Sequence, residues 1–209
     1  MTVRPRVGQP RTVPTRRGET RQQRGDDTRA AIIAETVACI LEEGFSAASA
    51  RHITERANVT WGVIQYHFGD RDQLLMAVVD EGFAGLRRSI AEMVLPAGPL
   101  RERIAVVVET AWTAFSHPTS MAALEILVAT RVSRNKKLNR HLIQVNNELT
   151  ALGKTLLVPD RHGDEIADLL WACLRGLTIP HMVTPRKYDF SKQRQALINL
   201  FTLYLSDEE

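Results

Sequence analysis

The side chains best suited to a chemical task lie together in residues 49–68, SARHITERANVTWGVIQYHF. Two short amphipathic stretches, 50–57 and 61–68, flank the tripeptide 58–60. Asn58 can adopt the left-handed conformation that ends a helix and allows the chain to turn. The pattern predicts a helix-turn-helix, a unit whose second helix enters the major groove of DNA.

Eight residues of this segment are candidate DNA contacts. Gln65 can form two hydrogen bonds with adenine, which makes it the leading base reader of the second helix. Tyr66 and His67 are better suited to positioning phosphates, and Gly62 allows the backbone to approach them closely. The full set is Ser49, Arg51, Thr60, Trp61, Gly62, Gln65, Tyr66 and His67.

Three members of this set have alternative roles. Thr60 can cap the second helix, donate a hydrogen bond to a phosphate, or do both. Trp61 can pack on the sugar-phosphate backbone or a thymine methyl, or it can be partly buried against the first helix. Arg51 can reach a base edge or a phosphate, or it can form a surface ion pair with Glu55 four residues later.

Helical periodicity precedes this segment. A first helix is expected from Asp27 or Thr28 to Glu43, and Gly44 should end it. Ser49 is then placed to cap the first helix of the helix-turn-helix.

A long helix should follow the helix-turn-helix. It begins after Asp70, which has capping-box spacing to Gln73, and continues to about Leu95. Residues 26–86 therefore form a predicted three-helix DNA-binding domain. The long helix links it to a second domain, residues 87–209.

The rest of the chain contains only helical patterns. No strand alternation or hairpin signal interrupts them, so the expected fold class is all-α. The last two helices are apolar enough to form a four-helix contact with their symmetry mates in a homodimer. The expected helices span 100–115, 119 or 120 to 131, 141–157, 164–182 and 192–205.

The basic charge of the chain is concentrated at its N-terminus. Residues 1–27 contain seven arginines and three acidic side chains, a net charge of +4, in a chain whose total is +3. The remaining residues therefore carry a net charge of −1. Residues 1–25 are expected to be a disordered basic arm that contacts phosphates or the minor groove. A solvated tail without such contacts is the alternative.

The two cysteines, Cys39 and Cys173, are far apart in the sequence and each lies among apolar helical neighbours. Their spacing indicates neither a disulfide framework nor a metal site, so we expect buried free thiols, no metal and no cofactor. No apolar run approaches the length of a membrane span, and no secretory signal is recognisable. These observations predict a cytoplasmic protein without a membrane partner.

The motifs between about Thr28 and Phe83 together resemble the TetR family of bacterial transcriptional regulators. The resemblance departs at Asn58, where Gly is usual, at Trp61, where a basic residue is common, and at Gln65, where Tyr is common. An operator sequence therefore does not transfer. The matching motifs are Thr28-Arg29, Gly44-Phe45, Arg51-x-Ile53, Ala57-x-Val59-Thr60, Gly62-x-Ile64-x-Tyr66-His67-Phe68 and Arg71-Asp72-Gln73-Leu74-Leu75.

This resemblance implies a homodimer that reads a palindromic double-stranded DNA operator and a C-terminal domain that binds a small-molecule effector. Ligand binding would move the linker helix and release DNA, as in a ligand-responsive repressor. No Gly-rich phosphate loop, nucleophile elbow or Cys–His pair is recognisable, so no enzymatic activity is expected. The alternatives are an all-helical enzyme or carrier with an incidental helix-turn-helix, and an activator or nucleoid-type DNA binder.

Six residues of the C-terminal half are candidate contacts for the effector, which is expected to be hydrophobic. Four are large apolar or aromatic side chains that could line a cavity, although each such residue is more often plain core. Glu125 and Arg175 are charged residues within apolar helices and could orient a polar group. The set is Trp112, Phe115, Met121, Glu125, Trp171 and Arg175.

Overall fold

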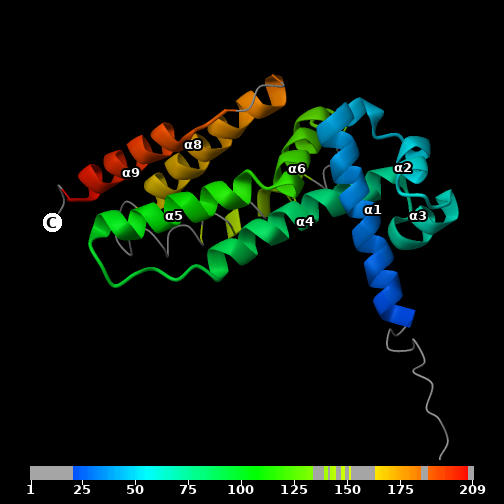
Figure 1. Cartoon of the computed structure of the whole chain (residues 1–209), viewed down its shortest axis with the longest axis horizontal. Helices are drawn as coiled ribbons and strands as arrows, with labels where there is room; N and C mark the ends of the chain where they lie inside the picture. The colour runs from blue at the N-terminus through cyan, green and yellow to red at the C-terminus, as the bar shows by residue number, and fades with distance from the viewer. Residues whose placement is uncertain are drawn as a thin grey trace, which may run out of the picture.

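The computed structural model describes residues 21–133, 163–184 and 188–206, together with 139–140, 142–144, 147–148 and 151. Within these residues the regular secondary structure is entirely helical, which confirms the expected all-α class (Figure 1). The expected helix 141–157 lies largely outside the described residues. The elements are α1 (Arg21–Glu43), η1 (Phe45–Ala47), α2 (Ala50–Arg56), α3 (Trp61–Phe68), α4 (Arg71–Ala91), α5 (Leu100–Phe115), α6 (Pro118–Ala129), α8 (Gly163–Val183) and α9 (Ser191–Ser206).

The first helix begins earlier than expected. Its first residue is Arg21, so the expected start at Asp27 or Thr28 is wrong, and the last five residues of the expected arm are helical. The Thr28 hydroxyl donates to the Arg24 carbonyl at 2.8 Å, as a threonine inside a helix does, and therefore does not cap one. Residues 1–20 of the arm lie outside the described residues.

Helices α1, α2, α3 and the start of α4 gather at one end of the molecule (Figure 1). Their apolar faces meet in a first core, in which Ile40, Ile53, Ile64 and Leu74 have at most 1% of their surface exposed. Helix α6 completes this core with Ala122, Ala123 and Ile126. The core behind the helix-turn-helix is thus closed by a helix from the C-terminal half.

Helix α4 takes part in two cores. Its N-terminal half contributes Leu74, Leu75 and Val78 to the first core, and its C-terminal half contributes Leu86 and Ile90 to a second core formed with α5, α8 and α9. Asp70 caps the helix as predicted, because its Oδ1 accepts from the Gln73 backbone N–H at 2.8 Å. The helix ends at Ala91, short of the expected end near Leu95.

Helix α8 is the most apolar long helix among the described residues. Its segment Glu165–Val183, with a mean hydropathy of 1.2, is by length and composition sufficient to cross a membrane, contrary to the sequence expectation. In the structure one face of α8 is buried in the second core through Ile166, Leu170 and Leu174. Only 33% of this segment is buried, and its other face lies at the surface of the chain.

Candidate nucleic-acid interface and ligand cavity

The helix-turn-helix forms with the predicted boundaries. The Ser49 hydroxyl accepts from the His52 backbone N–H at 3.2 Å and so caps α2. Asn58 has a φ of 51°, the left-handed conformation expected at the turn. Thr60 occupies the N-cap position of α3, but its side chain makes no capping hydrogen bond, so that part of the prediction is wrong. The Thr60 hydroxyl is therefore not used to cap α3.

Helix α3 divides into a buried and an exposed face. Ile64 and Phe68 are buried in the first core, as predicted. Gly62 and Gln65 are exposed to solvent. Tyr66 is 82% exposed and Trp61 is 39% exposed. Trp61 is thus less exposed than Tyr66 but still belongs to the exposed face of α3.

His67 lies between the two faces of α3. Its ring is half-buried and meets the Tyr66 ring edge to face, with 5.0 Å between the centroids. Phe68 lies on its other side at 6.2 Å. These contacts orient the imidazole beside Tyr66, at the margin of the exposed face.

Arg51 forms the surface ion pair that sequence reasoning offered as the alternative to a DNA contact. Its Nε lies 2.8 Å from Glu55 Oε1, and its side chain is 89% exposed. The Glu55 carboxylate raises the pKa of Arg51, and the guanidinium lowers the pKa of Glu55. An exposed pair of this kind is weak, so a phosphate could replace the carboxylate at small cost.

The two supporting helices are joined by one arginine. The Arg56 guanidinium on α2 donates to Glu42 at 2.8 Å and to Glu43, and lies 3.6 Å from Glu35, all on α1. Hydrogen bonds to the Glu42 and Glu43 carboxylates raise the pKa of Arg56, so it stays charged. The network fixes the angle at which α2, and with it α3, leaves α1.

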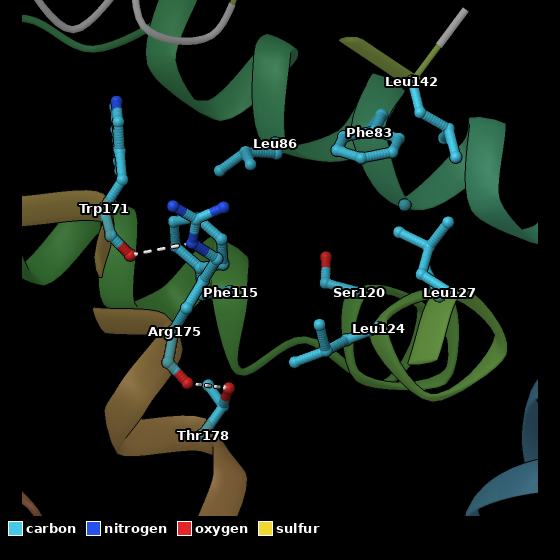
Figure 2. A pocket seen from close by; sticks show the side chains of 12 residues that line it. Phe83, Leu86, Phe115, Ser120, Leu124, Leu127, Leu142, Trp171, Arg175 and Thr178 are labelled. Carbon is cyan, nitrogen blue, oxygen red and sulfur yellow. Dashed lines mark hydrogen bonds between the residues drawn. The ribbon is translucent and has the colours of Figure 1, made fainter. Parts of the chain in front are cut away.

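A cavity of about 210 Å³ lies among α4, α5, α6 and α8 (Figure 2). Its wall is almost wholly apolar, and Arg175 is its one charged residue among those described. The Arg175 Nε donates to the Trp171 carbonyl at 3.2 Å, and Figure 2 shows the rest of the guanidinium directed into the cavity. The lining residues are Gly82, Phe83, Leu86, Phe115, Ser120, Ala123, Leu124, Leu127, Leu142, Trp171, Arg175 and Thr178.

Of the six predicted ligand contacts, the structure brings Phe115, Trp171 and Arg175 to this cavity. Met121 and Glu125 lie one turn apart on the other face of α6, away from the lining residues Ser120, Ala123, Leu124 and Leu127 of the same helix. The sequence of α6 is apolar on most sides, so it does not indicate which side of the helix faces the cavity.

Trp112 also lies outside the cavity. Its ring meets the Phe190 ring edge to face at 5.8 Å, and the Arg194 guanidinium lies 5.1 Å above it. Through these two contacts Trp112 on α5 packs against the start of α9. Sequence reasoning did not single out Gly82, which also lines the cavity. A glycine inside a long helix is a signal that another helix packs closely against it, and this signal was available in the sequence.

Glu125 connects the C-terminal half with the helix-turn-helix end of the molecule. Its Oε1 accepts from the Phe45 backbone N–H at 2.7 Å, immediately after Gly44 ends α1. Phe45 is the first residue of η1, and Ala48 caps its C-terminal end. Arg71 on α4 contacts this end, since its Nε donates to the Ala48 carbonyl at 2.6 Å. The joint between α1 and α2 is thus attached to α6 and to α4.

Residues 32–78 match the family model described as bacterial regulatory proteins, tetR family. Over these residues, the helix-turn-helix and the helices that flank it, the chain is similar to the TetR family. A curated TetR-type relative, the HTH-type transcriptional regulator BetI of Paraburkholderia phymatum, is 34% identical over 82 residues. That match covers 37% of this chain and 42% of the relative, so the alignment spans less than half of either protein.

Solved structures share the fold over most of the chain. A TetR transcriptional regulator from Chloroflexus aurantiacus has a TM-score of 0.66 at 17% identity. The match covers 88% of this chain and 96% of the chain of that regulator. NalD of Pseudomonas aeruginosa, the secondary repressor of the MexAB-OprM multidrug efflux pump, has a TM-score of 0.61 at 19% identity, with 86% and 95% covered. At these identities the likeness concerns the fold alone.

Replacing Glu125 tests the link between α6 and η1. Glu125→Ala should lower the free energy of unfolding by about 1–3 kcal/mol, because the half-buried Phe45 N–H loses its acceptor. Glu125→Gln keeps a carbonyl oxygen at this position and should lose less. Urea unfolding measures both variants, with hydrogen exchange at the Phe45 amide as the local readout. Equal losses for the two variants would contradict the role assigned to this hydrogen bond.

Proposed function

We propose that this protein is a dimeric transcriptional repressor of the TetR type that binds a palindromic operator and is released by a small, largely apolar molecule. The observation that carries the proposal is that α4 and α6 each contribute to both the first core and the wall of the cavity. Both helices pack in the core behind α3, and both line the cavity. A ligand that separates them therefore acts on the part of the molecule that reads DNA. As such a regulator, the protein would work in the cytoplasm.

The DNA-reading surface is the exposed face of α3. Trp61, Gly62, Gln65 and Tyr66 form it, and α3 contains no Lys or Arg. Attraction to phosphate must then come from neighbouring parts, and Arg51 at the start of α2 is the described residue best placed for it. Residues 1–20, which precede α1 and contain five arginines, are a second source in the proposal.

The dimer is proposed to form through α8 and α9. Along α8, Leu169, Ile179 and Val183 are 55%, 51% and 72% exposed, and they recur at steps that place them on one face with Ala172 and Gly176 between them. Small residues at the centre of such a face let a second helix approach closely. A contiguous apolar face on a soluble domain is a common mark of an interface.

Helix α9 extends the same apolar surface. Leu200 and Leu203 are 63% and 66% exposed, while Ile198, Phe201 and Leu205 face the core of their own chain. The helix is thus apolar on two sides, one of which has no partner among the described residues. A second copy of α8 and α9 is the partner that closes a four-helix contact by two-fold symmetry.

Release of DNA is proposed to start where α4 crosses α6. A Cβ placed on Gly82 would lie 3.0 Å from the Ala123 Cβ and 3.2 Å from the Thr119 carbonyl oxygen, so the two helices touch almost backbone to backbone. Gly82 and Ala123 also line the cavity. A ligand that fills the cavity would widen this crossing, shift the N-terminal half of α4, and strain the Glu125–Phe45 hydrogen bond.

The primary test is a footprint on the promoters of the protein's own gene and the adjacent gene. We expect one protected palindrome, and transcription from that promoter should rise when the gene is deleted. Gln65→Ala should change preference at one base pair in each half-site, at a cost of about 1–3 kcal/mol in binding free energy. Gln195→Ala, the same substitution on α9, is the matched control. An equal loss of affinity on all operator variants would show that Gln65 does not read a base.

The dimer surface is tested by placing a charge on it. Leu200→Glu should convert the dimer to a monomer at micromolar concentration, because an unpaired carboxylate would be buried in an apolar contact. Sedimentation velocity measures the change. Val94→Glu introduces the same residue at an exposed apolar position elsewhere, since Val94 is 85% exposed in the connection between α4 and α5, and it should leave the dimer intact. A Leu200→Glu protein that sediments as the wild type does would remove α9 from the interface.

The cavity should prefer a ligand with an anionic group on an apolar body, since its one charged residue among those described is Arg175. Octanoate and octylamine, which differ only in the head group, are suitable probes. Titration calorimetry should show tighter binding of octanoate by roughly 10- to 100-fold, the range that a hydrogen bond to a charged group supplies. Arg175→Lys should keep this preference and Arg175→Gln should lose it. Equal affinities of the wild type for both probes would dismiss the preference.

A further inference from the structure

Three potential metal ligands meet between α1 and α2. The Cys39 thiol, the Glu43 carboxylate and the His52 imidazole each place one ligand atom within 4.8 Å of the other two. Cys39 and Glu43 are one turn apart on α1, and His52 is held by the Ser49 cap at the start of α2. We propose that Cys39, Glu43 and His52 form a binding site for a thiophilic divalent cation of the Zn²⁺ type.

The spacing of the ligand atoms is close to what such an ion requires. Tetrahedral Zn²⁺ with sulfur, nitrogen and oxygen ligands separates neighbouring ligand atoms by roughly 3.3–3.6 Å. His52 Nε2 and Glu43 Oε2 are 2.8 Å apart, and the largest separation in the cluster is 4.8 Å. Side-chain rotations that move the ligand atoms by about 1 Å would lengthen the separation between His52 and Glu43 and shorten the largest separation, which gives the tetrahedral arrangement.

The cluster is closed on one side and open on the other. Cys39 is fully buried in the first core, whereas the His52 and Glu43 side chains are 36% and 37% exposed. An ion could enter from the Glu43 and His52 side and reach the sulfur at the bottom. Water would take the fourth ligand position on the solvent side, as it does in zinc sites with three protein ligands.

The charge around the cluster favours a cation. The one guanidinium present, Arg56, faces three carboxylates, those of Glu35, Glu42 and Glu43, which leaves two negative charges in excess. Arg56 binds the Oε1 of Glu43 and leaves Oε2 directed at His52. This orients the carboxylate as hydrogen-bonding groups around metal ligands do.

Binding of the ion requires the loss of one proton. Burial, followed by the nearby Glu43 carboxylate, raises the pKa of Cys39, so the thiol is protonated until the cation displaces its proton. Hydrogen bonds from His52 and Arg56 lower the pKa of Glu43, which is therefore already ionised.

The sequence did not reveal this site because its ligands are of three types and lie on two helices. The two cysteines, on which sequence reasoning about metals rested, do not meet. A bound ion would tie α2 to α1 beside Gly44 and stiffen the support of α3. The inference concerns the stability of this end of the molecule and does not depend on the proposed repressor function.

Cobalt titration of untagged, full-length protein tests the site directly. Co²⁺ bound to a thiolate produces a near-ultraviolet charge-transfer absorption, which we expect with one ion per chain in mildly alkaline buffer. Competition with Zn²⁺ should remove the absorption, and Zn²⁺ should raise the thermal midpoint. Because loss of a group that only orients a ligand costs 10- to 100-fold in affinity, Cys39→Ala and His52→Gln should each weaken Zn²⁺ binding by more than about 100-fold.

Cys173→Ala is the matched control, since it removes the other thiol, on α8, and should bind both ions as the wild type does. His52 is partly exposed, so His52→Gln reports on the site even where Cys39→Ala folds poorly. The proposal is overturned if the wild type shows no thiolate absorption with Co²⁺, if Cys39→Ala keeps it, or if Cys173→Ala loses it. Wild-type Zn²⁺ affinity in His52→Gln would equally dismiss the three-ligand site.

Discussion

The close packing of α4 against α6 is the constraint on which the rest of the molecule depends. A Cβ added at Gly82 would lie 3.0 Å from the Ala123 Cβ and 3.2 Å from the Thr119 carbonyl oxygen, so the neighbouring helix would have to shift by a few tenths of an ångström to admit it. Protein interiors are packed as densely as molecular crystals, so such a contact does not yield without moving both helices. The first core lies on one side of this crossing and the second core on the other. The cavity lies at the crossing itself.

The reading helix α3 depends on this arrangement for its existence. A helix of eight residues is unstable alone in water, and α3 is maintained by the burial of Ile64 and Phe68 and by the turn before it. Its exposed side is aromatic and amide in character, without a positive charge. The exposed groups of α3 are therefore positioned by apolar packing from behind, and in the proposed DNA complex phosphate attraction has to be supplied by other parts of the chain.

Charged groups at the same end act mainly on the angles between helices. Arg56 joins α2 to α1 through three carboxylates, Arg71 holds η1 to α4, and Glu125 holds η1 to α6. Each contact lies near a place where the chain turns sharply. The cluster of Cys39, Glu43 and His52 adds a place where a bound cation could tighten one of these joints.

Much of the fold could be predicted because its signals are local. The Asn58 turn, the Ser49 and Asp70 caps and the Gly44 stop depend on residues within one helical turn of each other, and the structure confirms them. The exposed face of α3 was also predictable, because Ile64 and Phe68 had to be buried together. The start of α1 was misjudged because Thr28 can either cap a helix or bond to the preceding turn, and both look alike in sequence.

The sequence by itself determined the helices, the turn and the residues available to read DNA, because short-range hydrogen bonds and apolar periodicity decide these. Only the tertiary structure decided which residues line the cavity, since the rotation of α6 about its axis depends on the helices that pack against it. It likewise decided that Glu125 binds Phe45 and that Cys39 meets His52. Such contacts join residues far apart along the chain, where spacing carries no information about distance.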